Sequence, residues 1–317
     1  MDLNMSDFLW VEKYRPKCVE DCILPDGIKD IFNGLLDQGE IPNLLLSGTA
    51  GVGKTTIAKA LCEQLGASYI VINGSDEGRF LDTIRNKVRQ FATTVSLTSG
   101  AKHKVVIIDE ADNTTNDVQL SLRNAVEEFH SNCRFIFTCN FINKIIEPLH
   151  SRCSVVQFKV PEEDKRDIQL QFLKRIKTIL VHEQIEHDDR VIAKLLQRYY
   201  PDWRRLINEI QALASNGSIG ADALALIPDI RVESLYASMK SKDYTSVRKW
   251  VVDNLNNDPT NVISKIYNTS DEYVVKKYIP ELVLVCAKYQ TYVPQVADQE
   301  INLLAFLTEI MMSCEFK

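Results

Sequence analysis

The sequence predicts an α/β domain with a parallel sheet, followed by two helical domains, and two patterns support this prediction. In the first half of the chain, four short apolar runs alternate with stretches of helical periodicity; the runs cover residues 44–46, 69–72, 105–108 and 135–138. Such alternation is typical of parallel sheets that are buried under helices on both faces. After residue 160 the strand-like runs stop, and helical periodicity alone continues.

The helices predicted for the first half lie between these strands. Apolar residues recur at helical spacing over residues 55–65, 81–92 and 117–129. Residues 93–104 are mostly polar and are predicted to form a loop or a frayed helix end. Together, the strands and helices predict an α/β domain over residues 1–158.

The second half is predicted to be helical throughout. Its first helix carries four apolar residues at helical spacing: Ile168, Phe172, Ile176 and Ile179. Two more helices are predicted over residues 189–199 and 202–214, and Asn216-Gly217 then provides a stop signal. These patterns predict a small helical domain over residues 159–228 and a helical C-terminal domain over residues 229–317.

Composition indicates a globular protein that does not coat nucleic acid. The 317 residues are 45% hydrophobic and 25% charged, and 43 acidic residues outnumber 37 basic ones. Any DNA contact must therefore come from a local basic patch. We find no secretory signal, no zinc spacing among the eight cysteines, and no apolar stretch long enough to cross a membrane. These features predict a protein of the reducing cytoplasm.

A phosphate-binding loop is the strongest motif in the sequence. Gly48-Thr49-Ala50-Gly51-Val52-Gly53-Lys54-Thr55 fits the pattern GxxxxGK[ST], and it lies between a predicted strand and a predicted helix. Glycines let backbone N–H groups turn toward phosphates, and the helix N-terminus adds a positive dipole. Lys54 is predicted to bind the β and γ phosphates, while Thr55 can ligate Mg²⁺. ATP and Mg²⁺ are therefore the predicted cofactors.

Polar residues that follow two other strands complete the predicted catalytic set. Asp109 and Glu110 end an apolar strand, where the side chains of a parallel sheet face the ligand crevice. Asp109 is predicted to hold Mg²⁺, and Glu110 is predicted to polarise the attacking water. Asn140 ends the next strand and is predicted to orient water against the γ-phosphate. Glu110, Lys54 and Asn140 thus form the predicted catalytic group of this chain.

Several motifs in a fixed order resemble one protein family. Val11-Glu12-Lys13-Tyr14-Arg15-Pro16, the phosphate-binding loop, Asp109-Glu110-Ala111-Asp112, Asn140, Ser151-Arg152-Cys153 and Arg204 follow the order and spacing of AAA+ clamp-loader ATPases. The sequence resembles both the small subunits of replication factor C and the large ATPase subunit of tailed-phage clamp loaders, over roughly residues 1–215. The resemblance implies an AAA+ P-loop domain, a helical lid domain and a helical collar domain that mediates oligomerisation.

The resemblance also implies individual roles. Val11, Glu12, Lys13, Tyr14 and Ile23 are expected to line the adenine pocket. The phosphate contacts are expected from Gly51, Val52, Gly53, Lys54, Thr55 and Thr56. Arg152 is expected to be an arginine finger that enters the ATP site of a neighbouring subunit, and Arg204 is expected to reach the γ-phosphate from the lid. A guanidinium suits both roles because it stays charged and binds phosphate through a planar fork.

DNA and clamp contacts are further expectations from the resemblance. Four arginines are expected to contact the DNA backbone: Arg79, Arg85, Arg89 and Arg123. Arg85 and Arg89 share a predicted helix face, which can equally be a basic face that contacts only solvent. Val95 and Leu97 are apolar residues in a polar loop and are expected to contact the clamp.

The leading functional hypothesis is an ATPase subunit of a sliding-clamp loader that opens the clamp and loads it on primer–template DNA. Its expected partners are copies of itself, a second clamp-loader subunit type, the clamp and the DNA, in the host cytoplasm if the chain is phage-encoded. The alternative is another AAA+ DNA motor, such as a helicase or a branch-migration ATPase, although we identify no aromatic pore loop. A non-catalytic scaffold is disfavoured because Lys54, Asp109, Glu110 and Arg152 are all present.

Overall fold

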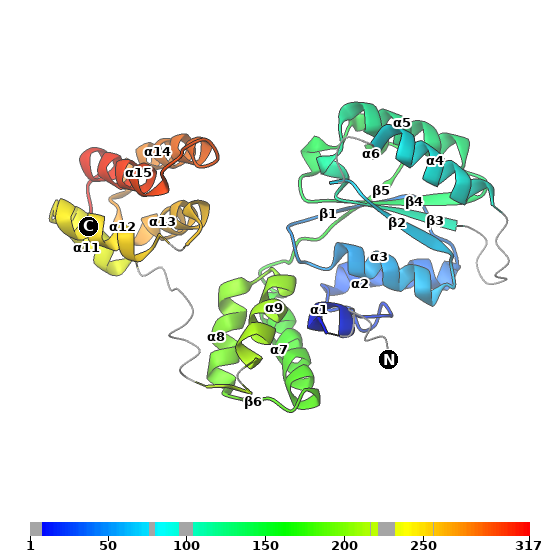
Figure 1. The fold of residues 1–317 in the computed structure, drawn as a ribbon, viewed down its shortest axis with the longest axis horizontal. Coiled ribbons are helices and arrows are strands. Elements are labelled where there is room, and N and C mark those ends of the chain that lie inside the picture. Colours follow the sequence, from blue (N-terminus) through cyan, green and yellow to red (C-terminus); the bar gives the residue numbers. More distant parts are fainter. Residues whose placement is uncertain (1–7, 76–79, 95–103, 216, 221–231, 256) are drawn as a thin grey trace. The chain divides into compact units, whose positions relative to one another are not determined.

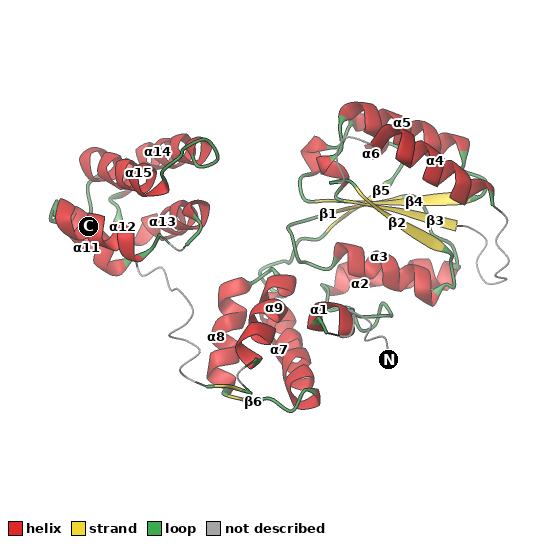
Figure 2. Cartoon of the chain, in the orientation of Figure 1, coloured by secondary structure: helices red, strands yellow, loops and turns green. Residues whose placement is uncertain are grey.

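The computed structural model describes residues 8–75, 80–94, 104–215, 217–220, 232–255 and 257–317. The chain forms two compact units, Met1–Ala221 and Asp222–Lys317. Figures 1 and 2 show the α/β part and the helical parts of the chain. The division into three domains at residues 158 and 228 stays a prediction.

A parallel sheet forms the centre of the first unit. Among the described residues its strand order is β2-β3-β4-β1-β5, and every neighbouring pair is parallel. The strands are β1 (Leu44–Ser47), β2 (Tyr69–Asn73), β3 (Lys104–Asp109), β4 (Cys133–Cys139) and β5 (Ser154–Gln157). The first four correspond to the predicted apolar runs, so the predicted fold class is confirmed. The edge strand β5 was not predicted, because Val156 is its only buried residue.

Helices cover both faces of this sheet (Figure 1). One face packs against α2 (Asp26–Gln38) and α3 (Lys54–Gln64), and the other packs against α4 (Phe80–Thr93), α5 (Asn116–Glu128) and α6 (Glu147–His150). Leu44 and Leu46 belong to the first core and Leu45 to the second, as the alternation of side chains along a strand requires. The loops that follow the carboxyl ends of the strands therefore start from a sheet that is packed on both faces.

Further helices complete the described part of the first unit. They are α1 (Trp10–Lys13), α7 (Lys165–His182), α8 (Asp189–Tyr199) and α9 (Trp203–Ala214). The stripe predicted for the first of the later helices is buried in α7, and Phe172 stacks on Trp203 with ring centroids 3.8 Å apart. A short parallel pair, β6 (Glu186–His187) and β7 (Ser218–Ile219), was not predicted, since two-residue strands carry no periodic signal.

The second unit is helical, as predicted. It contains α11 (Glu233–Lys240), α12 (Tyr244–Asp253), α13 (Pro259–Tyr273), α14 (Ile279–Tyr292) and α15 (Gln299–Ser313), together with the 3₁₀ turn η4 (Lys276–Tyr278). The 3₁₀ turns η2 (Ala111–Asn113) and η3 (Ile142–Lys144) belong to the first unit. Within the part of the chain that the structure describes, no helix is both long and apolar enough to cross a membrane.

Candidate functional site

The phosphate-binding loop encloses the ammonium group of Lys54. Its Nζ donates to Gly48 O at 2.6 Å, to Thr49 O at 2.7 Å and to Asn140 Oδ1 at 2.9 Å. Lys54 is only 8% exposed, and burial lowers the pKa of its ammonium group. A cation taken out of water in this way is stabilised by a nearby anion, so the loop fits the phosphates of a nucleotide.

Gly51 of this loop lies against the lid. Its φ angle is +75°, and a Cβ atom built there would lie 1.8 Å from Asp202 Oδ1. Asp202 caps α9, since its Oδ1 accepts a hydrogen bond from Arg205 N at 3.0 Å. The absence of a side chain at Gly51 therefore lets the loop and the start of α9 meet.

We predict that Gly51→Ala weakens ATP binding roughly tenfold, because the left-handed backbone disfavours any Cβ by about 1–2 kcal/mol and Asp202 must also move. Titration of a fluorescent ATP analogue measures the affinity. Gly34→Ala in α2 is the matched control: apart from its chain neighbours and the backbone of its own helix, no atom lies within 4 Å of its added Cβ, and alanine is expected to stabilise the helix by about 0.5–1 kcal/mol. Unchanged affinity in a folded Gly51→Ala protein contradicts the prediction.

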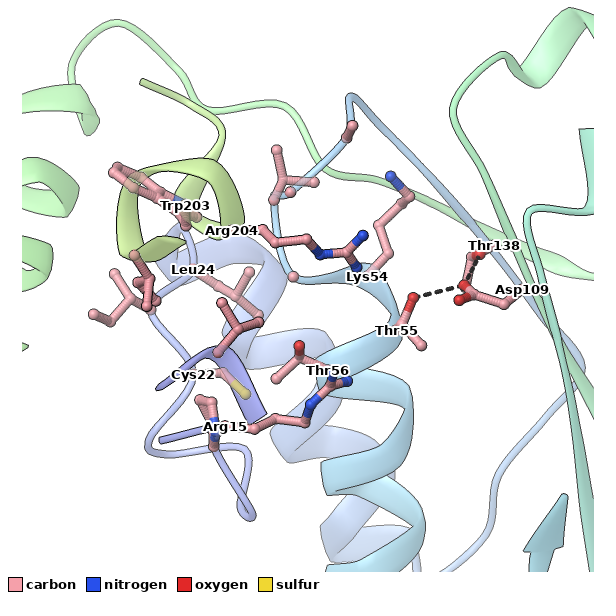
Figure 3. A pocket seen from close by; sticks show the side chains of 18 of the residues that line it. Arg15, Cys22, Leu24, Lys54, Thr55, Thr56, Asp109, Thr138, Trp203 and Arg204 are labelled. Carbon is pink, nitrogen blue, oxygen red and sulfur yellow. Dashed lines mark hydrogen bonds between the residues drawn. The ribbon is translucent and has the colours of Figure 1, made fainter. Parts of the chain in front are cut away.

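Thr55 and Asp109 meet at the start of α3 (Figure 3). Thr55 Oγ1 and Thr138 Oγ1 each donate to Asp109 Oδ1 at 2.6 Å. Hydroxyl and carboxylate oxygens are the ligand types that Mg²⁺ prefers, so the donor set fits this ion. Thr138 was not predicted. It lies on β4, two residues before Asn140, and only the pairing of β3 with β4 places it beside Asp109.

Glu110 follows Asp109 in a left-handed conformation, with φ +55°. Its Oε2 accepts from Ser75 Oγ and from Asn113 Nδ2, the latter at 3.1 Å. Gly74 makes room for this turn, since a Cβ there would lie 2.3 Å from Glu110 O. The carboxylate expected to polarise water is therefore held by two polar side chains that were not predicted as site residues.

The opposite end of the pocket is lined by the N-terminal segment and the lid. Val11, Tyr14 and Ile23 line it as expected, and so do the unpredicted residues Arg15 and Pro16. The further unpredicted lining residues are Cys22, Leu24, Cys139, Phe172, Trp203 and Ile207, while Ala50 belongs to the predicted phosphate-binding loop. Arg15 and Pro16 are the last two residues of the motif that begins at Val11, and Trp203 and Ile207 lie one helical turn apart, so the sequence indicates that these residues share a location with predicted ones.

Two residues expected in the adenine pocket bond elsewhere. Neither Glu12 nor Lys13 is among the residues that line the pocket. Glu12 accepts from Arg15 Nη2, and Lys13 Nζ donates to Glu183 Oε1 at 2.7 Å, just beyond α7. Tyr14 Oη also donates to Glu183 Oε1, and burial is the main cause that raises the pKa of Tyr14. The bonds from Lys13 and Tyr14 connect the N-terminal segment to the end of α7, while the Glu12 contact stays within the segment.

Arg204 reaches into the pocket from the first turn of α9 (Figure 3). Figure 3 shows its side chain directed toward Lys54. The residues expected for the phosphates also line this pocket: Gly51, Val52, Gly53, Lys54, Thr55 and Thr56. Asp109, Glu110 and Asn140 line it as well. The fold thus brings two cationic side chains, from the loop and from the lid, to one end of the pocket.

Arg152 is not among the residues that line this pocket. Its Nε donates to Glu127 Oε1 at 2.8 Å, and its Nη1 donates to Pro148 O at 2.8 Å. The guanidinium of Arg152 thus contacts α5 and α6, which cover the face of the sheet opposite α3. Within one chain, therefore, Arg152 is placed apart from the pocket that holds Lys54.

The arginines expected to contact DNA fall into two groups. Arg79, like Val95 and Leu97, lies outside the described residues, and the side chain of Arg85 in α4 is not described either. Arg89 Nη2 lies 3.0 Å from Glu128 Oε1, and Arg123 Nη2 lies 3.6 Å from Glu127 Oε1. Both described arginines are partly exposed and are paired with glutamates of α5.

Comparison with known proteins agrees with this geometry. Residues 44–160 match the ATPase family associated with various cellular activities (AAA), and residues 164–225 match the AAA+ ATPase lid domain of the sliding-clamp-loader large subunit. The sliding-clamp-loader large subunit of Escherichia phage RB69 is 33% identical, over 99% of this chain and 98% of that protein. The chain belongs to the AAA+ clamp-loader ATPases.

Other members of this clamp-loader family are similarly related. The sliding-clamp-loader large subunit of Enterobacteria phage T4 is 36% identical over 78% of each chain. The replication factor C small subunit of Saccharolobus solfataricus is 32% identical, over 98% of this chain and 96% of that protein. Membership of the family makes this chain a nucleotide-binding ATPase.

Solved structures show the same fold at lower sequence identity. A point mutant of Thermotoga maritima RuvB has a TM-score of 0.56 and 16% identity, covering 92% of this chain and 91% of that one. The Thermotoga maritima RuvB Holliday junction branch migration motor has a TM-score of 0.50 and 15% identity. The match covers 80% of this chain and 85% of that one. This likeness concerns the AAA+ fold alone.

Proposed function

We propose that this chain is the ATPase subunit of a sliding-clamp loader, which opens the clamp and leaves it on primer–template DNA. The observation that carries the proposal is the pocket in which the phosphate-binding loop and lid residue Arg204 lie together. A lid that contributes a phosphate-binding cation changes its position with the nucleotide state, and this couples ATP to the arrangement of subunits.

Each polar residue of the pocket would have a different role in hydrolysis. Lys54 and Arg204 would bind the phosphates through charge-assisted hydrogen bonds. Thr55 and Asp109 would hold Mg²⁺, which neutralises phosphate charge when bound. Glu110 would accept a proton from the attacking water, and Asn140, which already contacts Lys54 Nζ, would keep that water and the ammonium group in place.

The partners follow from the same proposal. Copies of this chain and a second subunit type would form a ring or spiral, in which Arg152 of one subunit enters the pocket of the next. Arg79, Arg85, Arg89 and Arg123 would follow the phosphates of the DNA, and Val95 and Leu97 would contact the clamp. Such a complex works where DNA is replicated, which is the cytoplasm of the host for a phage protein.

We predict that primed DNA and the cognate clamp together raise ATP turnover well above the basal rate of the full chain with its partner subunit. Turnover is measured by phosphate release with neither, either or both present, and blunt duplex DNA replaces primed DNA as the control. The Lys54→Ala protein sets the background rate. Stimulation by DNA that ignores the clamp would instead favour another AAA+ motor, and absence of turnover would favour a scaffold.

A further inference from the structure

A cluster of three charged side chains lies outside the nucleotide pocket. Glu127 Oε1 accepts from Arg152 Nε at 2.8 Å and also from Arg152 Nη2. The same oxygen lies 3.6 Å from Arg123 Nη2, one helical turn earlier on α5. One carboxylate oxygen is thus shared between an expected finger and an expected DNA contact.

Arg152, the expected arginine finger, is held by several hydrogen bonds to the elements around it. Helix α5 packs on α6, which directly precedes Arg152. Arg152 Nη1 donates to Pro148 O at 2.8 Å and to Ser151 Oγ at 3.2 Å. With the two bonds to Glu127, these contacts use four of the five N–H groups of the guanidinium and leave one on Nη2. The direction of Arg152 therefore depends on an acceptor from a different helix.

Arg123 is held less firmly in the cluster than Arg152 is. Its distance to Glu127 exceeds that of a hydrogen bond, and Arg123 Nε is buried without a hydrogen-bond partner. The Arg123 side chain is 36% exposed, against 27% for Arg152. A phosphate group would therefore draw away Arg123 more readily than Arg152.

We propose that Glu127 is a positioning residue that fixes the direction of Arg152 and makes this direction depend on what Arg123 binds. The inference rests on the proposed function, in which Arg152 acts on a neighbouring subunit and Arg123 faces DNA. Two guanidinium groups compete for one carboxylate oxygen. When a DNA phosphate binds Arg123, the whole charge of Glu127 acts on Arg152 and holds the finger in one orientation.

Ionisation of Glu127 is consistent with this role. The hydrogen bonds from Arg152 are the main cause that lowers the pKa of Glu127, and Arg123 acts in the same direction. The carboxylate therefore stays charged across the neutral range. An exposed pair of this kind contributes little to stability, so its removal should leave the chain folded.

Glu127→Ala tests the positioning role. It should lower turnover stimulated by a synthetic primer–template duplex about 10- to 100-fold, because a displacement of about 1 Å in a positioned group can have that effect. ATP affinity should be unchanged, which also shows that the protein is folded. Glu127→Gln, which keeps an acceptor oxygen, should recover part of the loss. Glu128→Ala is the matched control. Glu128 lies beside Glu127 on α5 and pairs with Arg89 instead, so its removal should leave turnover without DNA unchanged.

Two double-mutant cycles separate the possible outcomes. Glu127→Ala should have no further effect in the Arg152→Ala protein, and Arg123→Ala should raise DNA-free turnover about twofold to fivefold only where Glu127 is present. Additive effects, or normal stimulation in Glu127→Ala beside a defective Arg152→Ala, would overturn this inference alone. Normal stimulation in Arg152→Ala would instead overturn the proposed finger, and this inference with it.

Discussion

Arg152→Ala is expected to lower DNA-stimulated ATP turnover by about 10³–10⁵-fold, the effect of an arginine finger that is supplied by a neighbouring subunit. The physical reason is that the guanidinium stabilises charge on the phosphates only when two subunits are aligned. Nucleotide affinity should stay nearly unchanged, because Arg152 is not among the residues that line the pocket of its own chain. Phosphate release and nucleotide titration measure the two quantities.

Mixed complexes show whether the finger acts between chains. Arg152→Ala chains keep an intact pocket, and Lys54→Ala chains keep an intact finger, so their mixture should recover part of the stimulated turnover. Light scattering must confirm that each mixture assembles. If no mixture recovers activity although all of them assemble, Arg152 acts within its own chain or has no catalytic role.

Glu110→Gln is expected to bind ATP but to lose about 10²–10⁴-fold in turnover, since the amide cannot accept a proton from water. Its neighbours should stay in place, because a glutamine oxygen can still accept from Ser75 Oγ and Asn113 Nδ2. Single-turnover measurements separate the chemical step from binding. By contrast, Lys54→Ala should lose tight ATP binding, because the phosphates lose their direct cationic partner.

The control for Glu110→Gln is Glu128→Gln, an equally conservative change on the exposed face of α5. It should turn over ATP normally in the absence of DNA. A Glu110→Gln protein with the turnover of wild type would show that another group activates the water. The assignment of Glu110 would then have to be withdrawn, while the phosphate-binding role of Lys54 would stand.

Site residues that lie close together in the sequence could be predicted from it, whereas contacts between residues far apart in the sequence could not. The loop around Lys54 is contiguous, and its glycines, lysine and threonine act through their own backbone, so the motif suffices to predict it. Asp109 and Glu110 directly follow an apolar strand, which predicts their place at the edge of the sheet. By contrast, Ser75 contacts Glu110 from 35 residues away, and neither its type nor its neighbours identify Glu110 as its partner.

The strands of the sheet likewise differ in how far the sequence alone predicts them. The buried strands β1, β3 and β4 are apolar over nearly their whole length, and the sequence alone predicts them. The edge strand β5 exposes three of its four residues and depends on pairing with β1. Likewise, the sequence contains no sign that Lys13 bonds away from the pocket, because its partner Glu183 is brought near only by the packing of α7.

The sequence by itself determined the fold class, the phosphate-binding loop and the family, because each is encoded by neighbouring residues or by periodic burial of apolar side chains. The tertiary structure alone brought Thr55 and Thr138 to one oxygen of Asp109, and it alone brought Arg152 to the oxygen of Glu127 that Arg123 approaches from one helical turn away. Such pairs depend on strand order and helix packing. These bring together residues that are distant in sequence, and the types of those residues do not identify their partners.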